Sequence, residues 1–256
     1  AAEILKTGEE YTVFDIGDIE RDRIERIVHG LGIPFSFDAV AVCAQDHGVP
    51  PEGVSHLDYR HQVFKTALDK APFPHTLLYG AAEVPRTFNR LCSIARRSGA
   101  LPAGEVFVMD SGMAAILGAS MDPRAKTHER FMILDMATSH TLGAAMYQGE
   151  IAGFFEYHTR DIEPGRLEEM IEGLAEGSLD HARVLKEGGH GAYIRKAVGT
   201  GVMDLIITTG PKRRIARSSS LSLFLGAPLG DNMMTGTVGL LEALRRHKGL
   251  APISYL

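Results

Sequence analysis

The chain is poor in cysteine, in clustered positive charge and in long apolar runs. Cys43 and Cys92 are its only cysteines, too few for this chain alone to build a four-sulfur cluster or a three-cysteine radical site. With a net charge of -5 and no long Lys/Arg stripe, it lacks the phosphate-neutralising surface that nucleic-acid binding requires. No apolar run approaches the ~20 residues of a membrane helix. We therefore expect no iron–sulfur cluster, no nucleic-acid partner and no membrane span.

The composition that remains is that of a globular protein. Of 256 residues, 45% are hydrophobic and 23% are charged, and this length favours one large domain or two ordinary ones. Both cysteines lie within apolar strand or helix patterns, which indicates small buried hydrophobes rather than reactive thiols. The opening residues show no positively charged, apolar leader, so we expect a cytoplasmic location.

Strand and helix patterns alternate in the first half of the chain. Apolar strands at 38–45 and 106–109 end in Asp46-His47-Gly48 and Asp110-Ser111-Gly112, respectively. The other predicted elements are helices at 18–31, 59–68, 84–97 and 113–119 and a short strand at 76–79. This alternation favours a parallel or mixed sheet covered by helices.

The second half opens with three consecutive strands over 131–159, joined first by a polar turn and then by Gln148-Gly149. Further predicted elements are a helix at 164–174, strands at 205–208 and 221–225, and a final helix at 233–246. The glycine-rich segment 177–201 is interpreted as an insertion outside the core. The charged, proline-containing stretch 121–129 connects the halves, so we expect an incomplete first α/β lobe at 1–122 and a second lobe at 123–256.

The order of elements in the second half, three strands followed by helix, strand, helix, strand and helix, resembles the ribonuclease-H-like half-domain of the actin, Hsp70 and sugar-kinase ATPases. In that superfamily two such halves face each other across a nucleotide cleft. The sequence ILDMATSHT resembles the phosphate loop of the second half, and IITTGPKR resembles its adenosine-side turn. The chain departs from the pattern at Ala137, where glycine is usual, and at His140, where a small residue is more common.

A closer resemblance is to a prokaryotic domain family of unknown function within that superfamily, often labelled as a pyruvate formate-lyase activating enzyme. The sequences AVCAQDHG, VFVMDSGMAAILGA, SHTLGAAMYQGEIAGFFEYHT, TTGPKRR and GDNMMTGTVGLLEAL carry it. An activating enzyme of that kind uses a cysteine-bound iron–sulfur cluster, so the cysteine count disfavours this role. The superfamily's opening three-strand meander and Asp-x-Gly-Thr turn are absent before residue 38, and residues 13–18 fit a strand-to-helix turn instead. We therefore expect an N-terminal portion to be missing.

The first polar turn of the second half is the leading candidate site. Asp135, with Thr138, Ser139, His140 and Thr141 after it, could hold phosphate through hydroxyl and backbone N–H groups, with Asp135 positioning a metal-bound water. The resemblance implies Mg²⁺ and ATP as the ligands. The competing interpretation is an ordinary hairpin turn rich in turn-forming residues.

Other candidates stand at strand ends, where ligands bind in α/β sheets. Asp46, His47 and Asp110 are candidate catalytic residues: His47 is suited to proton transfer near neutral pH, whereas Asp110 could equally cap the next helix. Thr209, Gly210 and Lys212 could meet an adenine or a phosphate at a helix N-terminus, and a solvated basic helix is the alternative.

Metal binding is the remaining possibility. Asp135 is one candidate ligand. Glu156 and His158 lie on one face of the third strand, and together with His140 they could bind a metal. The spacing is not a zinc signature, and a hydrogen-bonded pair of polar residues is the competing explanation. The other histidines, His190 among them, show no ligand spacing.

These patterns together predict binding, and hydrolysis or transfer, of a nucleotide phosphate in a cleft between two lobes, as an ATPase or phosphotransferase would perform it. The expected partner is a small phosphorylated ligand. A non-catalytic regulatory or scaffold module with the same fold is the alternative.

Overall fold

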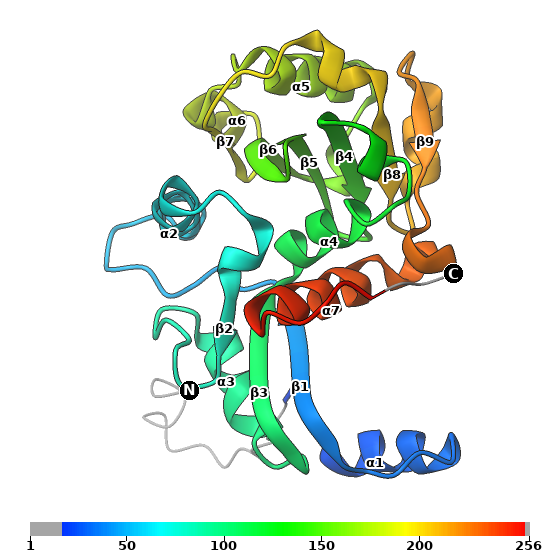
Figure 1. Cartoon of the computed structure of the whole chain (residues 1–256). Helices are drawn as coiled ribbons and strands as arrows, with labels where there is room; N and C mark the ends of the chain where they lie inside the picture. The colour runs from blue at the N-terminus through cyan, green and yellow to red at the C-terminus, as the bar shows by residue number, and fades with distance from the viewer. Residues whose placement is uncertain (1–16, 254–256) are drawn as a thin grey trace.

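A computed structural model describes residues 17–253 and contains two β-sheets with two helices between them (Figure 1). The intervening helices are α4 (Ser111–Ala119) and α7 (Thr235–His247). The remaining helices are α1 (Arg21–Gly30), α2 (His56–Lys70), α3 (Asn89–Ser98), α5 (Pro164–Glu176) and α6 (His181–Lys186). This is the expected two-lobed α/β fold with mixed sheets and flanking helices. Within the described range, no helix is both long and apolar enough to cross a bilayer.

The first lobe contains a three-stranded sheet in the order β1-β3-β2. Strand β1 (Phe37–Ala44) runs parallel to β3 (Ala103–Asp110), and β2 (Leu78–Gly80) runs antiparallel to β3. The expected strand at 76–79 begins later because Pro74–Leu77 form a 3₁₀ turn. No strand precedes β1 within residues 17–36, and most of the 13–18 segment lies outside the described residues.

The second lobe contains a six-stranded sheet in the order β7-β6-β5-β4-β8-β9. Its strands are β4 (Arg130–Met136), β5 (His140–Tyr147), β6 (Glu150–His158), β7 (Gly191–Ile194), β8 (Ile206–Thr209) and β9 (Leu223–Leu225). The first three form an antiparallel meander, and β8 and β9 continue the sheet parallel to β4. The predicted tight turn has φ values of 52° at Gln148 and 81° at Gly149. The ribonuclease-H-like strand order is confirmed.

The segment 177–201 differs from its expected place outside the core. Its strand β7 pairs antiparallel with β6, and Val184 of α6 and Ala192 of β7 are buried in the apolar cluster on one face of the second sheet. Short glycine-flanked strands such as this one carry little periodicity, so the sequence alone did not reveal the pairing. The segment also brings His190 beside the end of β6, since the backbone N–H of His190 donates to the carbonyl of Glu156 over 2.8 Å.

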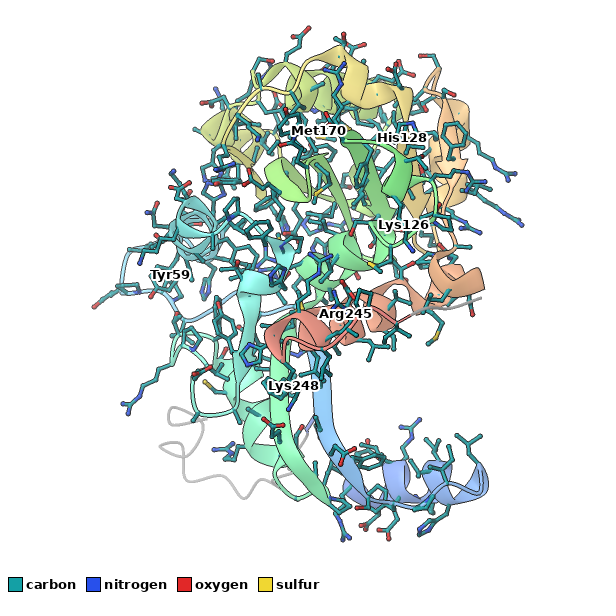
Figure 2. The ribbon with its side chains drawn as sticks, in the orientation of Figure 1. Tyr59, Lys126, His128, Met170, Arg245 and Lys248 are labelled. Carbon is teal, nitrogen blue, oxygen red and sulfur yellow. The ribbon has the colours of Figure 1, made fainter. Side chains whose placement is uncertain are left out.

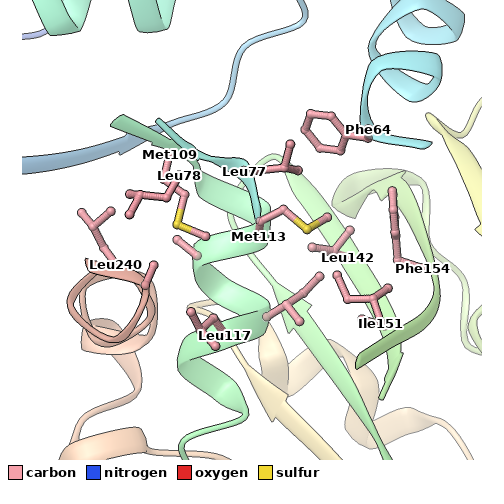
Figure 3. Close-up of a cluster of buried hydrophobic side chains, with 14 of the residues drawn as sticks. Phe64, Leu77, Leu78, Met109, Met113, Leu117, Leu142, Ile151, Phe154 and Leu240 are labelled. Atoms are coloured by element: carbon pink, nitrogen blue, oxygen red, sulfur yellow. The ribbon is translucent and has the colours of Figure 1, made fainter. Parts of the chain in front are cut away.

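One apolar cluster spans both lobes. Figure 3 shows Met113 and Leu117 of α4 between residues of the first lobe, such as Leu77, and residues of the second sheet, such as Leu142 and Ile151. The other face of the second sheet packs separately, against α5 and α6. The lobes are therefore joined through a shared core rather than through a linker alone.

Helices α4 and α7 approach until their backbones touch. A Cβ added at Gly118 would lie 1.8 Å from the Thr235 carbonyl oxygen, and one added at Gly239 would lie 1.8 Å from the Ala114 carbonyl oxygen. Only glycine permits this approach. The crossing fixes the N-terminal end of α7 beside α4, which matters for the site described next.

Candidate functional site

A cavity of about 400 Å³ lies where the two lobes meet. The N-terminal turns of α4 and α7 contribute Ser111, Gly112, Thr235 and Gly236 to its wall. From the second sheet come Asp135, Ala137, Thr138, Ser139, His140 and Gly210, and from the first lobe Gln45, Arg60 and Asp110. The carboxyl ends of β4 and β8 thus face two helix N-termini.

The β4–β5 turn is held by the end of β6. Thr159 donates its backbone N–H to the Ser139 carbonyl over 2.9 Å and its hydroxyl to the Ala137 carbonyl over 2.8 Å. Thr138 and Ser139 are left exposed along the cavity. Thr141 lies elsewhere: it is buried, and its hydroxyl lies 3.0 Å from that of Thr159. Of the residues expected to hold phosphate, Thr141 therefore belongs to the turn's scaffold.

Asp135 stands at the end of β4 on the cavity wall. Its Oδ1 accepts a hydrogen bond of 2.7 Å from the Thr209 hydroxyl. Burial raises the pKa of the Asp135 carboxyl, and the Thr209 hydrogen bond opposes that rise only in part. No salt bridge within residues 17–253 involves Asp135, so this carboxylate has no cationic side chain beside it.

The turn after β8 brings Gly210 to the cavity. Its φ is +88°, and an added Cβ would lie 2.3 Å from the Met136 carbonyl oxygen, so a side chain would not fit. Lys212 is exposed and does not line the cavity. The helix expected here is only a 3₁₀ segment, Arg213–Ser218.

The strand-end acids of the first lobe take different places. Asp46 is buried, and its two oxygens accept from the backbone N–H groups of Gly48 over 2.8 Å and Leu91 over 2.9 Å. Asp110 caps α4 by accepting from the Met113 N–H over 3.0 Å and also lines the cavity. The helix cap expected as one alternative for Asp110 is confirmed, and the same side chain also lies on the cavity wall.

Arg60 of α2, which the sequence analysis missed, connects the two lobes. It donates to Glu156 of β6 over 2.5 Å and to Asp110 over 3.0 Å, and all three side chains are buried. Burial alone would raise the pKa of Glu156, but the Arg60 guanidinium holds it well below its ordinary range. Burial raises the pKa of Asp110 despite the same guanidinium. The sequence did carry a signal, because Arg60 shares the apolar face of α2 with Phe64 and Leu68.

Three histidines gather beside this ion pair: His140 opens β5, His158 closes β6, and His190 precedes β7. Their ring centroids lie 4.4 to 4.9 Å apart. His47 is near, with its ring centroid 5.8 Å from that of His190. Burial lowers the pKa of His140 to about 4 and also lowers the pKa of His47.

Of the three residues expected to share a face and bind a metal, His140 and His158 lie together, whereas Glu156 has other partners. The Glu156 carboxylate is engaged by Arg60 and by Gln45, whose Nε2 donates to it over 2.6 Å. His190 takes the third place instead. Linear spacing could not identify His190, because it follows His158 by 32 residues and only the β6–β7 pairing places the two together.

Several solved structures resemble the chain at low sequence identity. The ethanolamine utilization protein EutJ from Carboxydothermus hydrogenoformans is 13% identical over 88% of this chain and 71% of its own, with a TM-score of 0.37. The activator of the 2-hydroxyisocaproyl-CoA dehydratase from Clostridium difficile, with bound ADPNP, is 12% identical over 61% and 74%, with a TM-score of 0.30. The ROK hexokinase from Thermus thermophilus is 15% identical over 79% and 81%, with a TM-score of 0.23. No curated protein sequence matches significantly.

The family assignment comes from the sequence itself. Residues 3–215 match one family profile, a range that includes Asp135, the Arg60 ion pair and all three clustered histidines. It ends before α7, which supplies Thr235 and Gly236 to the cavity. The chain belongs to the family described as "Putative pyruvate format-lyase activating enzyme (DUF1786)".

Proposed function

We propose that the chain binds the phosphate groups of a nucleotide such as ATP, together with Mg²⁺, in the cavity between its lobes. The observation that carries this proposal is the convergence of the α4 and α7 N-termini with the β4–β5 turn on one cavity. The helix dipole favours anions at helix N-termini, and the cavity is lined by the first residues of both helices. The volume of about 400 Å³ is within the usual range for small-molecule sites.

Asp135 is the proposed anchor of the cation. Its Oδ1 already accepts from Thr209, while a carboxylate with no cationic side chain beside it gains most from a metal ion. Mg²⁺ prefers oxygen ligands and is usually held by one or two carboxylates together with substrate phosphates. Thr138 and Ser139, exposed on the same wall, are placed to donate to phosphate oxygens.

The contribution of the first lobe differs from our initial expectation. Asp46 is committed to the Gly48 and Leu91 amides, and Asp110 to the Met113 amide and Arg60, so Ser111 is the proposed contact from that side. His47 remains a candidate for proton transfer beside His140, 6.3 Å away between ring centroids.

A regulatory module that binds nucleotide without turnover is favoured by one specific observation. Asp110 and Glu156 are both paired with Arg60, which leaves Asp135 as the carboxylate free of such pairing on the cavity wall. Turnover by an ATPase or phosphotransferase would have to use Asp135 for both metal and water. Measuring ADP formation over hours, alongside binding, separates the two.

Isothermal titration calorimetry tests the proposal. We expect saturable binding of ATP that strengthens at least about 10-fold when Mg²⁺ is added, and that Asp135→Asn abolishes this gain without altering binding in EDTA. Asp161→Asn, an exposed acid in the 3₁₀ turn after β6, is the matched control. Absence of saturable binding, or an unchanged Mg²⁺ effect in Asp135→Asn, would contradict the proposal.

A further inference from the structure

The histidine cluster has the dimensions of a metal site. Candidate ligand nitrogens of His140, His158 and His190 all lie within 4.8 Å of one another. The Nε2 atoms of His158 and His190 are 3.1 Å apart. Tetrahedral ligands at 2.0–2.1 Å from a zinc ion are separated by about 3.4 Å, so small side-chain rotations suffice to close the three nitrogens around one ion.

Hydrogen bonds satisfy only some of the ring nitrogens of the cluster. His140 Nε2 is buried with no hydrogen-bond partner in the described part of the chain. The Nε2 atoms of His158 and His190 share one hydrogen bond, in which one ring donates its N–H and the other accepts. A shared cation could accept a lone pair from each of the three rings and would so give His140 Nε2 a partner as well.

The protein around His190 orients its ring for coordination. Its Nδ1 lies 3.5 Å from Glu156 Oε1 without forming a hydrogen bond, while its Nε2 points toward His158. A carboxylate on this side of the ring favours the proton on Nδ1 and leaves Nε2 for a metal, an arrangement common behind metal-bound histidines. Arg60 and Gln45 fix Glu156 in turn.

The backbone holds the three residues in advance of any ion. His140 and His158 are direct cross-strand partners in the β5–β6 pair, and the His190 N–H is bonded to the carbonyl of Glu156. A site built on paired strands needs little reorganisation to bind.

We propose that His140, His158 and His190 bind a divalent transition metal ion of the zinc class at the edge of the cavity. Imidazole ligands suit Zn²⁺, Co²⁺ and Ni²⁺ and do not suit Mg²⁺. This site is thus chemically distinct from the proposed Mg²⁺ position at Asp135, and it does not depend on nucleotide binding. Three protein ligands leave a fourth coordination position open, as in catalytic zinc sites, and His140 lines the cavity.

Metal titration of the purified chain without nucleotide is the direct test. After EDTA treatment and dialysis, we expect one Zn²⁺ per chain by calorimetry and by elemental analysis, and no heat from Mg²⁺ at the same concentrations. Co²⁺ should give the intense visible absorption of a tetrahedral centre in the unaltered protein. This spectrum is read without any substitution, so it tests the site even where a variant folds poorly.

Substitutions then assign the ligands. His158→Ala and His190→Ala should each weaken Zn²⁺ binding by more than about 100-fold, and Glu156→Gln by roughly 10- to 100-fold, the effect typical of a residue that orients a ligand. His128→Ala is the matched control. His128, labelled in Figure 2, precedes β4 and lies more than about 20 Å of strand length from the cluster. A second control is His61→Ala, which removes one ring of the stacked pair His61 and His181.

Two results would overturn the proposal. One is the absence of stoichiometric Zn²⁺ binding by the unaltered chain, together with a Co²⁺ spectrum like that of the aqueous ion. The other is Zn²⁺ affinity that survives in His158→Ala and His190→Ala but falls in His61→Ala, which would place the ion at the surface pair.

Discussion

Arg60 places one positive charge between two buried carboxylates, Glu156 and Asp110, that belong to different lobes. Removing Arg60 leaves both carboxylates buried without a cationic partner. We expect Arg60→Met to lower the free energy of unfolding at pH 7 by about 3–5 kcal/mol, the usual effect of breaking a buried ion pair. Urea unfolding measures this change. Arg183→Met, at an exposed i,i+4 pair with Glu187, should leave the free energy of unfolding nearly unchanged.

The same ion pair predicts a pH dependence. Because the folded-state pKa of Glu156 is held below its ordinary value, the pair's contribution is fully present above about pH 4–5 and is lost as pH falls toward the folded-state pKa. The stability difference between the unaltered chain and Arg60→Met should therefore narrow on acidification. A difference that is constant from pH 7 to pH 3 would show that Arg60 acts through packing instead.

The contribution of Asp135 to stability should depend on pH with the opposite sign. Burial raises its folded-state pKa, so the unfolded chain releases this proton first and stability falls as pH rises past the ordinary carboxyl range. We expect Asp135→Asn to stabilise the ligand-free chain by roughly 1–3 kcal/mol at pH 7 and by little at pH 3. Thermal unfolding at the two pH values measures the effect. Destabilisation at pH 7 would mean that the carboxylate is already compensated within the protein.

At the scale of whole elements, the close crossing of α4 and α7 predicts which glycine substitutions destabilise the protein. An alanine at Gly118 or Gly239 places its Cβ 1.8 Å from a backbone carbonyl oxygen of the other helix. Backbone cannot rotate away as a side chain can, so we expect each variant to lose at least about 2–3 kcal/mol. Gly236→Ala, on the same helix with no atom within 4 Å of the added Cβ, should be neutral or stabilising by up to about 1 kcal/mol. Denaturant midpoints compare the three.

Site residues that are close together in the sequence could be predicted from it, whereas contacts between distant segments could not. Asp135, Thr138, Ser139 and His140 share one turn, so their common place on the cavity followed from a single hairpin pattern. Arg60 and His190 joined the site through tertiary packing and strand pairing, which leave no mark on local periodicity. The same limit explains segment 177–201, whose short strand β7 is recognisable only beside β6.

At the scale of the molecule, α7 belongs by sequence to the second lobe but packs against α4 and against β1 of the first. Figure 2 shows Arg245 and Lys248 near its C-terminal end, where Lys248 pairs with Glu105 of β3. The apolar cluster around α4 likewise takes residues from both sheets. Neither lobe completes its core without the other, although the sequence suggested a division near residue 122.

A shared core predicts one cooperative unfolding transition for the whole chain. When each lobe contributes buried surface to the other, partial unfolding exposes the common cluster and is disfavoured at equilibrium. We expect calorimetry to give a single peak whose calorimetric and van't Hoff enthalpies agree, and Zn²⁺ or Mg²⁺-ATP to move that peak as a unit, because any ligand of the native state stabilises everything that unfolds with it. Gly239→Ala, which weakens the joint between the lobes, should lower or split the peak, whereas Gly236→Ala should not. Two separate peaks in the unaltered chain, with ligand shifting only one, would show that the lobes fold independently and that the buried cluster is not what holds the cavity together.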